Sequence, residues 1–168
     1  MVTKTMALEI NAEKTKYMRM WVEERNRNGN NFEMGHKSFE RVSSFIYLGS
    51  EISNENSINQ EVQRRQIAGN RAYYGNIKLI SSRLLTRKTK LKIYRTLIRP
   101  VVTYGAETWN LSADDMKKLR IFERKIVRRI YGPVCESGNW RIRTNLEIEV
   151  ILNNEGSQMH YIIAAKMT

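Results

Sequence analysis

The stretch that decides the fold reads LSADDMKKLRIFERKIVRRIYGP, residues 111–133. Its apolar side chains recur at the helical period. They are Met116, Leu119, Phe122, Ile126 and Ile130. A second stripe with the same period is basic. It consists of Lys117, Arg120, Arg124 and Arg128. Gly132-Pro133 is a typical helix end, so the pattern predicts an amphipathic helix over about 113–131.

Asp114 and Asp115 open this helix and are the only aspartates in the sequence. Adjacent carboxylates can hold two catalytic metal ions, but such a site needs further acids converging on the same ions. The spacing places none here. Ser112 stands where the N-cap belongs, and Asp115 follows three residues later, as in a capping box with Asp in place of Glu. Both aspartates suit the first turn, where the helix dipole favours negative charge. We therefore interpret SADD as a helix cap.

Two more helices are predicted before it. The first should run over about 58–80, with Ser57 as its cap, and its small residues would allow a neighbour to approach closely. Those small residues are Ala68, Gly69, Ala72 and Gly75. The second should begin near Thr86, with an apolar stripe of Leu91, Tyr94, Ile98 and Val101. Pro100 should kink or divide it.

The N-terminal third has a different pattern. Tyr17 to Val22 suggests a strand, residues 23–31 have a loop composition, and Phe32 to Ile52 suggests two or three short strands. SNENS, residues 53–57, is a second loop. The predicted fold class is α+β, with a short β-rich N-terminal part followed by a mainly α-helical bundle.

Positive charge is concentrated in the helical part. The formal net charge of the 168-residue chain is +12, and residues 58–131 hold 18 Lys and Arg against 5 Asp and Glu. A single basic stripe is most often a solvated helix face. Basic stripes are also present in the first two predicted helices, at Arg64, Arg71 and Lys78 and at Lys88, Lys92, Arg95 and Arg99. Three consecutive helices with basic stripes instead favour one positive surface, which would attract phosphates without regard to sequence.

Several function classes find no support. No apolar run approaches the ~20 residues of a membrane span, and a basic amphipathic membrane binder fits poorly with so much core pattern. His36 and His160 lie far apart without a cysteine cluster, which disfavours a zinc site. The single cysteine, Cys135, and the absence of a signal-peptide pattern suggest an intracellular, reducing compartment, with nucleus or cytoplasm left open.

An ordered series of motifs resembles the reverse transcriptases of non-LTR (LINE-like) retrotransposons. ALEINAEKTKYM (7–18) resembles the segment after their active-site hairpin, and FIYLGSEI (45–52) resembles their primer-grip hairpin. RRQIAGNRAYYG, LLTRKTKLKIYRTLIRPVVTYGAETWNL and LRIFERKIVRRIYGPV resemble the thumb region. WRIRTNLEI (140–148) resembles the segment beyond the thumb. The resemblance covers about residues 7–150.

The resemblance implies a C-terminal portion of such an enzyme. Residues 1–56 would be a partial palm with the primer grip, 57–133 a helical thumb-like region, and 134–168 an extension. The family holds its metal-binding aspartates upstream, in a Tyr/Phe-x-Asp-Asp turn, so no catalytic residue and no cofactor is expected here, whereas the full-length family enzyme uses Mg²⁺. Lys14 matches a family lysine near the incoming nucleotide and would be a vestigial general acid.

The expected partner is RNA, DNA or an RNA–DNA duplex, with the missing upstream polymerase part as a further partner and no membrane. Tyr47, Leu48 and Gly49 match the primer-grip turn. The thumb residues that we expect to contact phosphates are Arg64, Arg65, Arg71, Lys78, Arg83, Lys88, Lys92 and Arg95. Tyr104 and Trp109 are expected to be core anchors.

Two alternatives remain open beside a polymerase fragment that binds primer–template. The chain could be a small stand-alone RNA- or DNA-binding module without a polymerase role. A hydrolase or transferase is disfavoured, because the sequence has no converging acids, Gly-rich phosphate loop or nucleophile motif.

Overall fold

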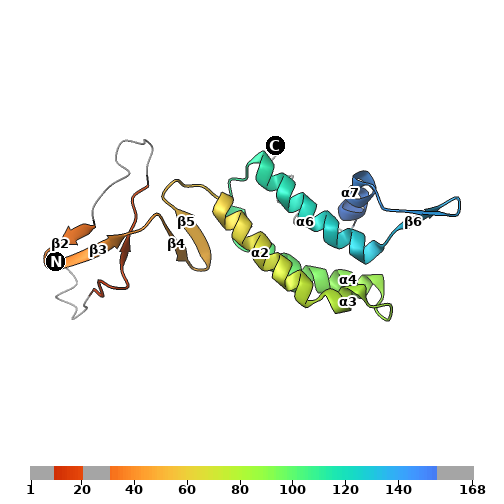
Figure 1. The fold of residues 1–168 in the computed structure, drawn as a ribbon, viewed down its shortest axis with the longest axis horizontal. Coiled ribbons are helices and arrows are strands. Elements are labelled where there is room, and N and C mark those ends of the chain that lie inside the picture. The colour runs from red at the N-terminus through yellow and green to blue at the C-terminus, as the bar shows by residue number, and fades with distance from the viewer. Residues whose placement is uncertain (1–9, 21–30, 155–168) are drawn as a thin grey trace. The chain divides into compact units, whose positions relative to one another are not determined.

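The computed structural model describes residues 10–20 and 31–154. The chain folds as two compact units, Met1–Ser57 and Ile58–Thr168. Small sheets form the first unit, and helices dominate the second (Figure 1). This confirms the predicted α+β class. The separate extension predicted for residues 134–168 stays a prediction.

A three-stranded sheet forms part of the N-terminal unit. It comprises β1 (Lys16–Tyr17), β2 (Phe32–Met34) and β3 (Lys37–Arg41), in the order β1-β3-β2. Strand β3 pairs in parallel with β1 and antiparallel with β2. The Phe39 side chain is buried against the sheet's aromatic residues. The strand predicted from Tyr17 onward ends at Tyr17, which pairs with Arg41, the last residue of β3. Residues 21–22 of the predicted strand lie outside the described part.

Strands β4 (Ser44–Tyr47) and β5 (Ser50–Ser53) form an antiparallel hairpin in the same unit. Leu48 and Gly49 make its two-residue loop, with φ of +47° and +84°. Two successive positive φ values match the twist of the flanking strands, and glycine adopts them without strain. Residues 32–52 therefore begin four strands rather than two or three, because the chain reverses at both Gly35-His36 and Leu48-Gly49.

The second unit consists of three helical segments, a hairpin and a final helix. The segments are α2 (Asn59–Gly75) with α3 (Ile77–Ser81), then α4 (Arg87–Ile93), η1 (Tyr94–Ile98) and α5 (Arg99–Thr103), then η2 (Ala106–Thr108) and α6 (Ala113–Tyr131). The hairpin is β6 (Val134–Glu136) with β7 (Asn139–Arg141), followed by α7 (Asn145–Asn154). Helices α2 and α6 run in the same direction, and α4 begins the returning segment (Figure 1).

The first predicted helix is divided at Asn76. The Asn76 side chain donates to the carbonyl of Ala72 at 2.9 Å, a local bond that competes with the helix ladder. The chain therefore continues as the short helix α3. The prediction that Ser57 caps this helix is wrong. The N-cap position is Ile58, which makes no side-chain capping bond, and the Ser57 N–H donates to Ser53 Oγ at 3.1 Å.

The second predicted helix begins where expected. Thr86 is its N-cap, and Thr86 Oγ1 accepts from the Thr89 N–H at 3.2 Å. Pro100 was expected to kink or divide the helix; the chain instead stays helical through it, with a change of helix type just before it. Pro100 has no N–H to donate to the carbonyl of Thr96, and the five residues from Tyr94 to Ile98 form a π-helix just before it.

Helix α6 spans Ala113–Tyr131, as predicted, and SADD is its cap. Ser112 Oγ accepts from the Asp115 N–H at 3.2 Å and donates to Asp115 Oδ2 at 2.6 Å. The Asp115 carboxylate is buried and lies 3.5 Å from Lys118 Nζ. Asn59 can donate its side-chain amide to both oxygens of the same carboxylate, which links the starts of α2 and α6.

The main core lies between these helical segments. Its fully buried members include Val62, Ile80, Ile98, Val102 and Ile126. Trp109 is 2 % exposed, which confirms it as a core anchor. The same prediction for Tyr104 is wrong, because α5 ends at Thr103 and the Tyr104 side chain is 50 % exposed. The Arg65 guanidinium lies over its ring, 4.5 Å from the centroid.

Close approach by neighbouring helices occurs at Gly69. A Cβ there would overlap Val102 Cγ2 and lie 3.0 Å from Phe122 Cζ. Around Gly75, also in α2, nothing lies within 4 Å of the corresponding position. Of these two glycines, only Gly69 is needed for packing.

This difference gives a matched pair of substitutions. Gly69→Ala should lower the free energy of unfolding by about 1–3 kcal/mol, because overpacking outweighs the better helix propensity of Ala. Gly75→Ala should leave it unchanged or raise it by up to about 1 kcal/mol. Urea unfolding followed by circular dichroism measures both. Equal effects of the two substitutions would contradict the close packing at Gly69.

Candidate nucleic-acid interface

The helical unit buries three of the five acids of residues 58–131. Glu61, Asp115 and Glu123 are each no more than 1 % exposed, whereas Glu107 and Asp114 are exposed. A buried carboxylate must be paired or hydrogen-bonded. Glu61 pairs with Arg64 and Arg65, its near neighbours on α2, at 2.8 and 2.6 Å. Glu107 and Asp114 are therefore the acids of residues 58–131 that remain at the surface.

Glu123 is held from a different element. The Tyr94 hydroxyl in η1 donates to Glu123 Oε1 in α6 at 2.9 Å. Burial, followed by the nearby Glu123 charge, raises the pKa of Tyr94 well above its usual value. The phenol therefore stays protonated and remains a donor to the carboxylate.

A basic groove opens on this unit, with a volume of about 950 Å³. We use the name basic groove for the hollow lined by cations from the α3–α4 loop, α4, α6 and the segment after β7. These cations are Arg83, Lys90, Lys125, Arg128, Arg129 and Arg143. No carboxylate lines the groove, and its other lining residues are mainly apolar or aromatic.

Neutral groups hold three of these cations, Lys125, Arg128 and Arg129, in place. Arg129 Nε donates to Ser81 Oγ at 3.0 Å, and Lys125 Nζ donates to the Tyr74 hydroxyl at 3.0 Å. Arg128 Nε donates to the carbonyl of Arg143 at 3.1 Å. Within the described part of the chain, none of the six cations forms an ion pair with a carboxylate. The described carboxylates therefore leave the charge of the six cations without an ion-pair partner.

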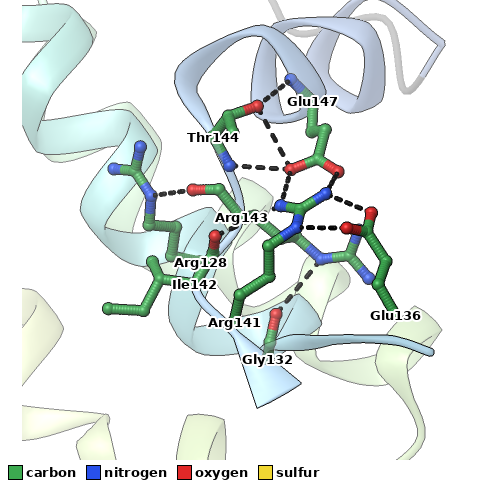
Figure 2. A network of polar contacts seen from close by, with 8 residues as sticks. All are labelled: Arg128, Gly132, Glu136, Arg141, Ile142, Arg143, Thr144 and Glu147. Carbon is green, nitrogen blue, oxygen red and sulfur yellow. Dashed lines mark hydrogen bonds and ion pairs between the residues drawn. The ribbon is translucent and has the colours of Figure 1, made fainter. Parts of the chain in front are cut away.

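The wall that carries Ile142 and Arg143 is fixed by a polar network (Figure 2). The Arg141 guanidinium lies between the carboxylates of Glu136 and Glu147, and Arg141 Nη2 is 2.7 Å from Glu147 Oε1. Arg143 Nε donates to the carbonyl of Gly132 at 3.1 Å. Together, these contacts tie the hairpin to α7 and to the end of α6.

Thr144 and Glu147 begin α7 with a capping box. The Thr144 N–H donates to Glu147 Oε2 at 2.7 Å, and the Glu147 N–H donates to Thr144 Oγ1 at 3.3 Å (Figure 2). The side-chain bond from Arg141, followed by that backbone bond, lowers the pKa of Glu147 to about 2. The side-chain bond from Arg141 also lowers the pKa of Glu136.

The predicted phosphate contacts are distributed unequally. Only Arg83 lines the basic groove. Arg64 and Arg65 neutralise the buried Glu61, so both have a structural task. Arg95 is half-buried beside Tyr94. The remaining predicted contacts are exposed on α2, α3 and α4: Arg71, Lys78, Lys88 and Lys92. Binding by any of these residues stays a prediction.

The family-derived residues of the N-terminal unit lie in turns. Tyr47, Leu48 and Gly49 form the tip of the β4–β5 hairpin, where Tyr47 and Leu48 are 58 % and 76 % exposed. Lys14 is exposed in a turn, and its backbone N–H donates to Asn11 Oδ1 at 3.1 Å. The roles that the resemblance implies for these residues stay predictions.

Most groove residues were missed as candidate contacts. Arg128 stood out only as part of the α6 stripe, and Lys90, Lys125, Arg129 and Arg143 were not singled out. One feature of the sequence could have indicated some of them. Lys90, Arg128 and Arg129 have no acid three or four residues away, which is the spacing at which helical side chains meet.

Neither a metal cluster nor a membrane-spanning helix is found in residues 10–20 and 31–154. No three His, Cys, Asp or Glu side chains gather there in a way that could hold a metal ion. No helix in these ranges is both long and apolar enough to cross a membrane. The described residues do not fit the Mg²⁺ site of the resembled family, and we derive no metal-dependent step for them.

The buried Tyr94–Glu123 bond can be tested by removing one hydroxyl. Tyr94→Phe should lower the free energy of unfolding by about 1–3 kcal/mol, because Glu123 loses a donor while it stays buried. Tyr73→Phe is the matched control, since Tyr73 is also buried and its hydroxyl has no hydrogen bond within the described residues. Thermal or urea unfolding measures both, and equal stabilities of the two variants would refute this role for Tyr94.

The Arg141 network predicts a pH dependence. The folded pKa of Glu147 is lowered to about 2 from 4.5. Its contribution to stability is therefore complete above about pH 4.5 and is lost as the pH falls towards 2. NMR titration of the Glu147 carboxyl should give a pKa near 2 in the wild type. In Arg141→Gln it should be clearly higher. A value near 4.5 in both proteins would contradict the network.

Comparison with known proteins gives one distant relative. No family model matches the chain, and no solved structure matches it. Over 127 residues, the chain is 27 % identical to a transposon-derived protein of Caenorhabditis elegans. The aligned region covers 76 % of this chain but only 45 % of that relative. The chain is therefore distantly homologous to a transposon-derived protein and spans less than half of its length.

Proposed function

We propose that this chain binds nucleic acid through its helical unit, as the thumb of a non-LTR retrotransposon reverse transcriptase would. The observation that carries the proposal is the basic groove, where six cations meet without a carboxylate. The similarity to a transposon-derived protein and the ordered motif series support the same origin. The proposed role is binding, and it assigns no catalytic residue to this chain.

The chemistry of the groove suits phosphate oxygens. Arginine and lysine are its only charged lining residues, and phosphate groups accept from both. Contacts to the phosphate backbone release counterions and carry no sequence information. The proposal therefore expects binding to RNA–DNA hybrids and other nucleic acids that depends steeply on salt and little on sequence.

The test is a fluorescence anisotropy titration of a labelled RNA–DNA hybrid at about 50 and about 200 mM salt. If all six groove cations contact phosphates, the affinity should fall about a thousandfold over this range. Arg83→Glu/Lys90→Glu should weaken binding at least about tenfold more than Lys78→Glu/Lys88→Glu. The two variants have the same change in net charge, but only the first pair lines the groove. Circular dichroism checks that both variants fold.

Two outcomes would overturn the proposal. The first is a folded wild-type protein that binds neither the hybrid nor either single strand at low salt. The second is an equal loss of affinity in the two variants, because binding would then follow the overall charge of the unit and not the groove.

A further inference from the structure

The basic groove has a second chemical character besides its charge. Tyr73 and Tyr131 line it, together with Ile80, Ile130, Pro133 and Ile142. The Ile142 side chain is 76 % exposed, so an apolar surface stands in the groove beside Arg143. A ligand that offered only phosphates would gain nothing from this apolar surface. The lining fits a ligand with both negative charge and flat apolar groups.

The aromatic rings already stack with cations. The Arg87 guanidinium lies 4.8 Å from the centroid of the Tyr131 ring, and the Arg143 guanidinium lies 6.0 Å from it. Lys125 Nζ lies 5.2 Å from the centroid of the Tyr73 ring. Nucleic-acid bases stack on both tyrosine rings and arginine planes, and they do so largely without sequence preference. The groove thus combines the two elements of single-strand binding, cations along the backbone and stacking surfaces.

The volume of the basic groove and the accessibility of the bases distinguish a single strand from a duplex as its ligand. The volume of about 950 Å³ is near the upper end of the range for small-ligand sites, about 300–1,000 Å³. A duplex keeps its bases stacked inside the helix and presents mainly phosphates and sugars. Bases can reach Tyr131 and Ile142 only from an unpaired strand.

Resting on the proposed function, we infer that the basic groove holds unpaired nucleotides of a single strand. The backbone phosphates contact the groove cations, and one or more bases lie against Tyr131 and Ile142. Stacking contributes about 1–3 kcal/mol per base in single-strand sites, which corresponds to about fivefold or more in affinity.

The experiment compares three labelled probes with the same number of phosphates: an oligothymidine, an abasic strand of the same length and a blunt duplex. The wild-type chain should bind oligothymidine at least about fivefold more tightly than the abasic strand, and the duplex should resemble the abasic strand. Tyr131→Leu should remove most of this difference. Tyr104→Leu is the matched control, because it also removes an Arg–Tyr pair but not one that lines the groove.

Tyr131 also packs against the core, so a second variant keeps the test valid if Tyr131→Leu does not fold. Ile142→Ser changes an exposed side chain and should reduce the preference for oligothymidine in the same direction. Equal binding of all three probes, unchanged in Ile142→Ser, would overturn this inference and leave nucleic-acid binding intact. A competition experiment gives a further test, in which polyglutamate or unlabelled oligothymidine displaces the labelled oligothymidine. If polyglutamate displaces it as efficiently per charge as unlabelled oligothymidine does, the inference is also overturned. Failure to bind any of the three probes would overturn the proposed function itself.

Discussion

The helical unit depends on partners for three carboxylates that are buried inside it. A buried charge without a partner would cost several kcal/mol. Two of the three acids are held by near neighbours in sequence: Glu61 by the arginines one turn later, and Asp115 by the Ser112 cap and Lys118. Glu123 is held across the unit by Tyr94, which connects α6 to η1. The Tyr94–Glu123 bond thus joins two helical segments that the apolar core also packs together.

The same arrangement produces the positive surface. Glu61 and Asp115 are engaged with their near neighbours Arg64, Arg65 and Lys118, so these acids are not available to pair with cations elsewhere on the unit. Of the five acids in residues 58–131, only Glu107 and Asp114 are exposed. Stability and surface charge therefore have one structural origin, and a substitution that expels a buried acid would affect both. No acidic side chain is among the residues that line the basic groove.

Local signals were sufficient to predict helix α6 and its cap, since Ser112, Asp115 and Gly132 act within one turn of a helix end. Trp109 was predicted as a core anchor because a large apolar ring is seldom exposed. The same reasoning gave a wrong prediction for Tyr104, because the exposure of this side chain depends on where α5 ends. The β6–β7 hairpin was missed, although Ser137-Gly138 gives a two-residue loop with φ of +49° and +83°. The basic groove could not be predicted, because its residues are brought together only by tertiary packing.

Helical periodicity identifies which side chains share a face, but it does not say whether a cation on that face serves the interior or a ligand. The position of the nearest acid decides this more directly. Arg64 and Arg65 stand three and four residues after Glu61 and pair with it, whereas Arg83, Lys90, Arg128 and Arg129 have no acid at that spacing. Arg143 does have one, Glu147, but Arg141 already binds that carboxylate. A cation thus has no local carboxylate to pair with when the acids at this spacing are absent or engaged, and packing then determines which of these cations meet in one groove.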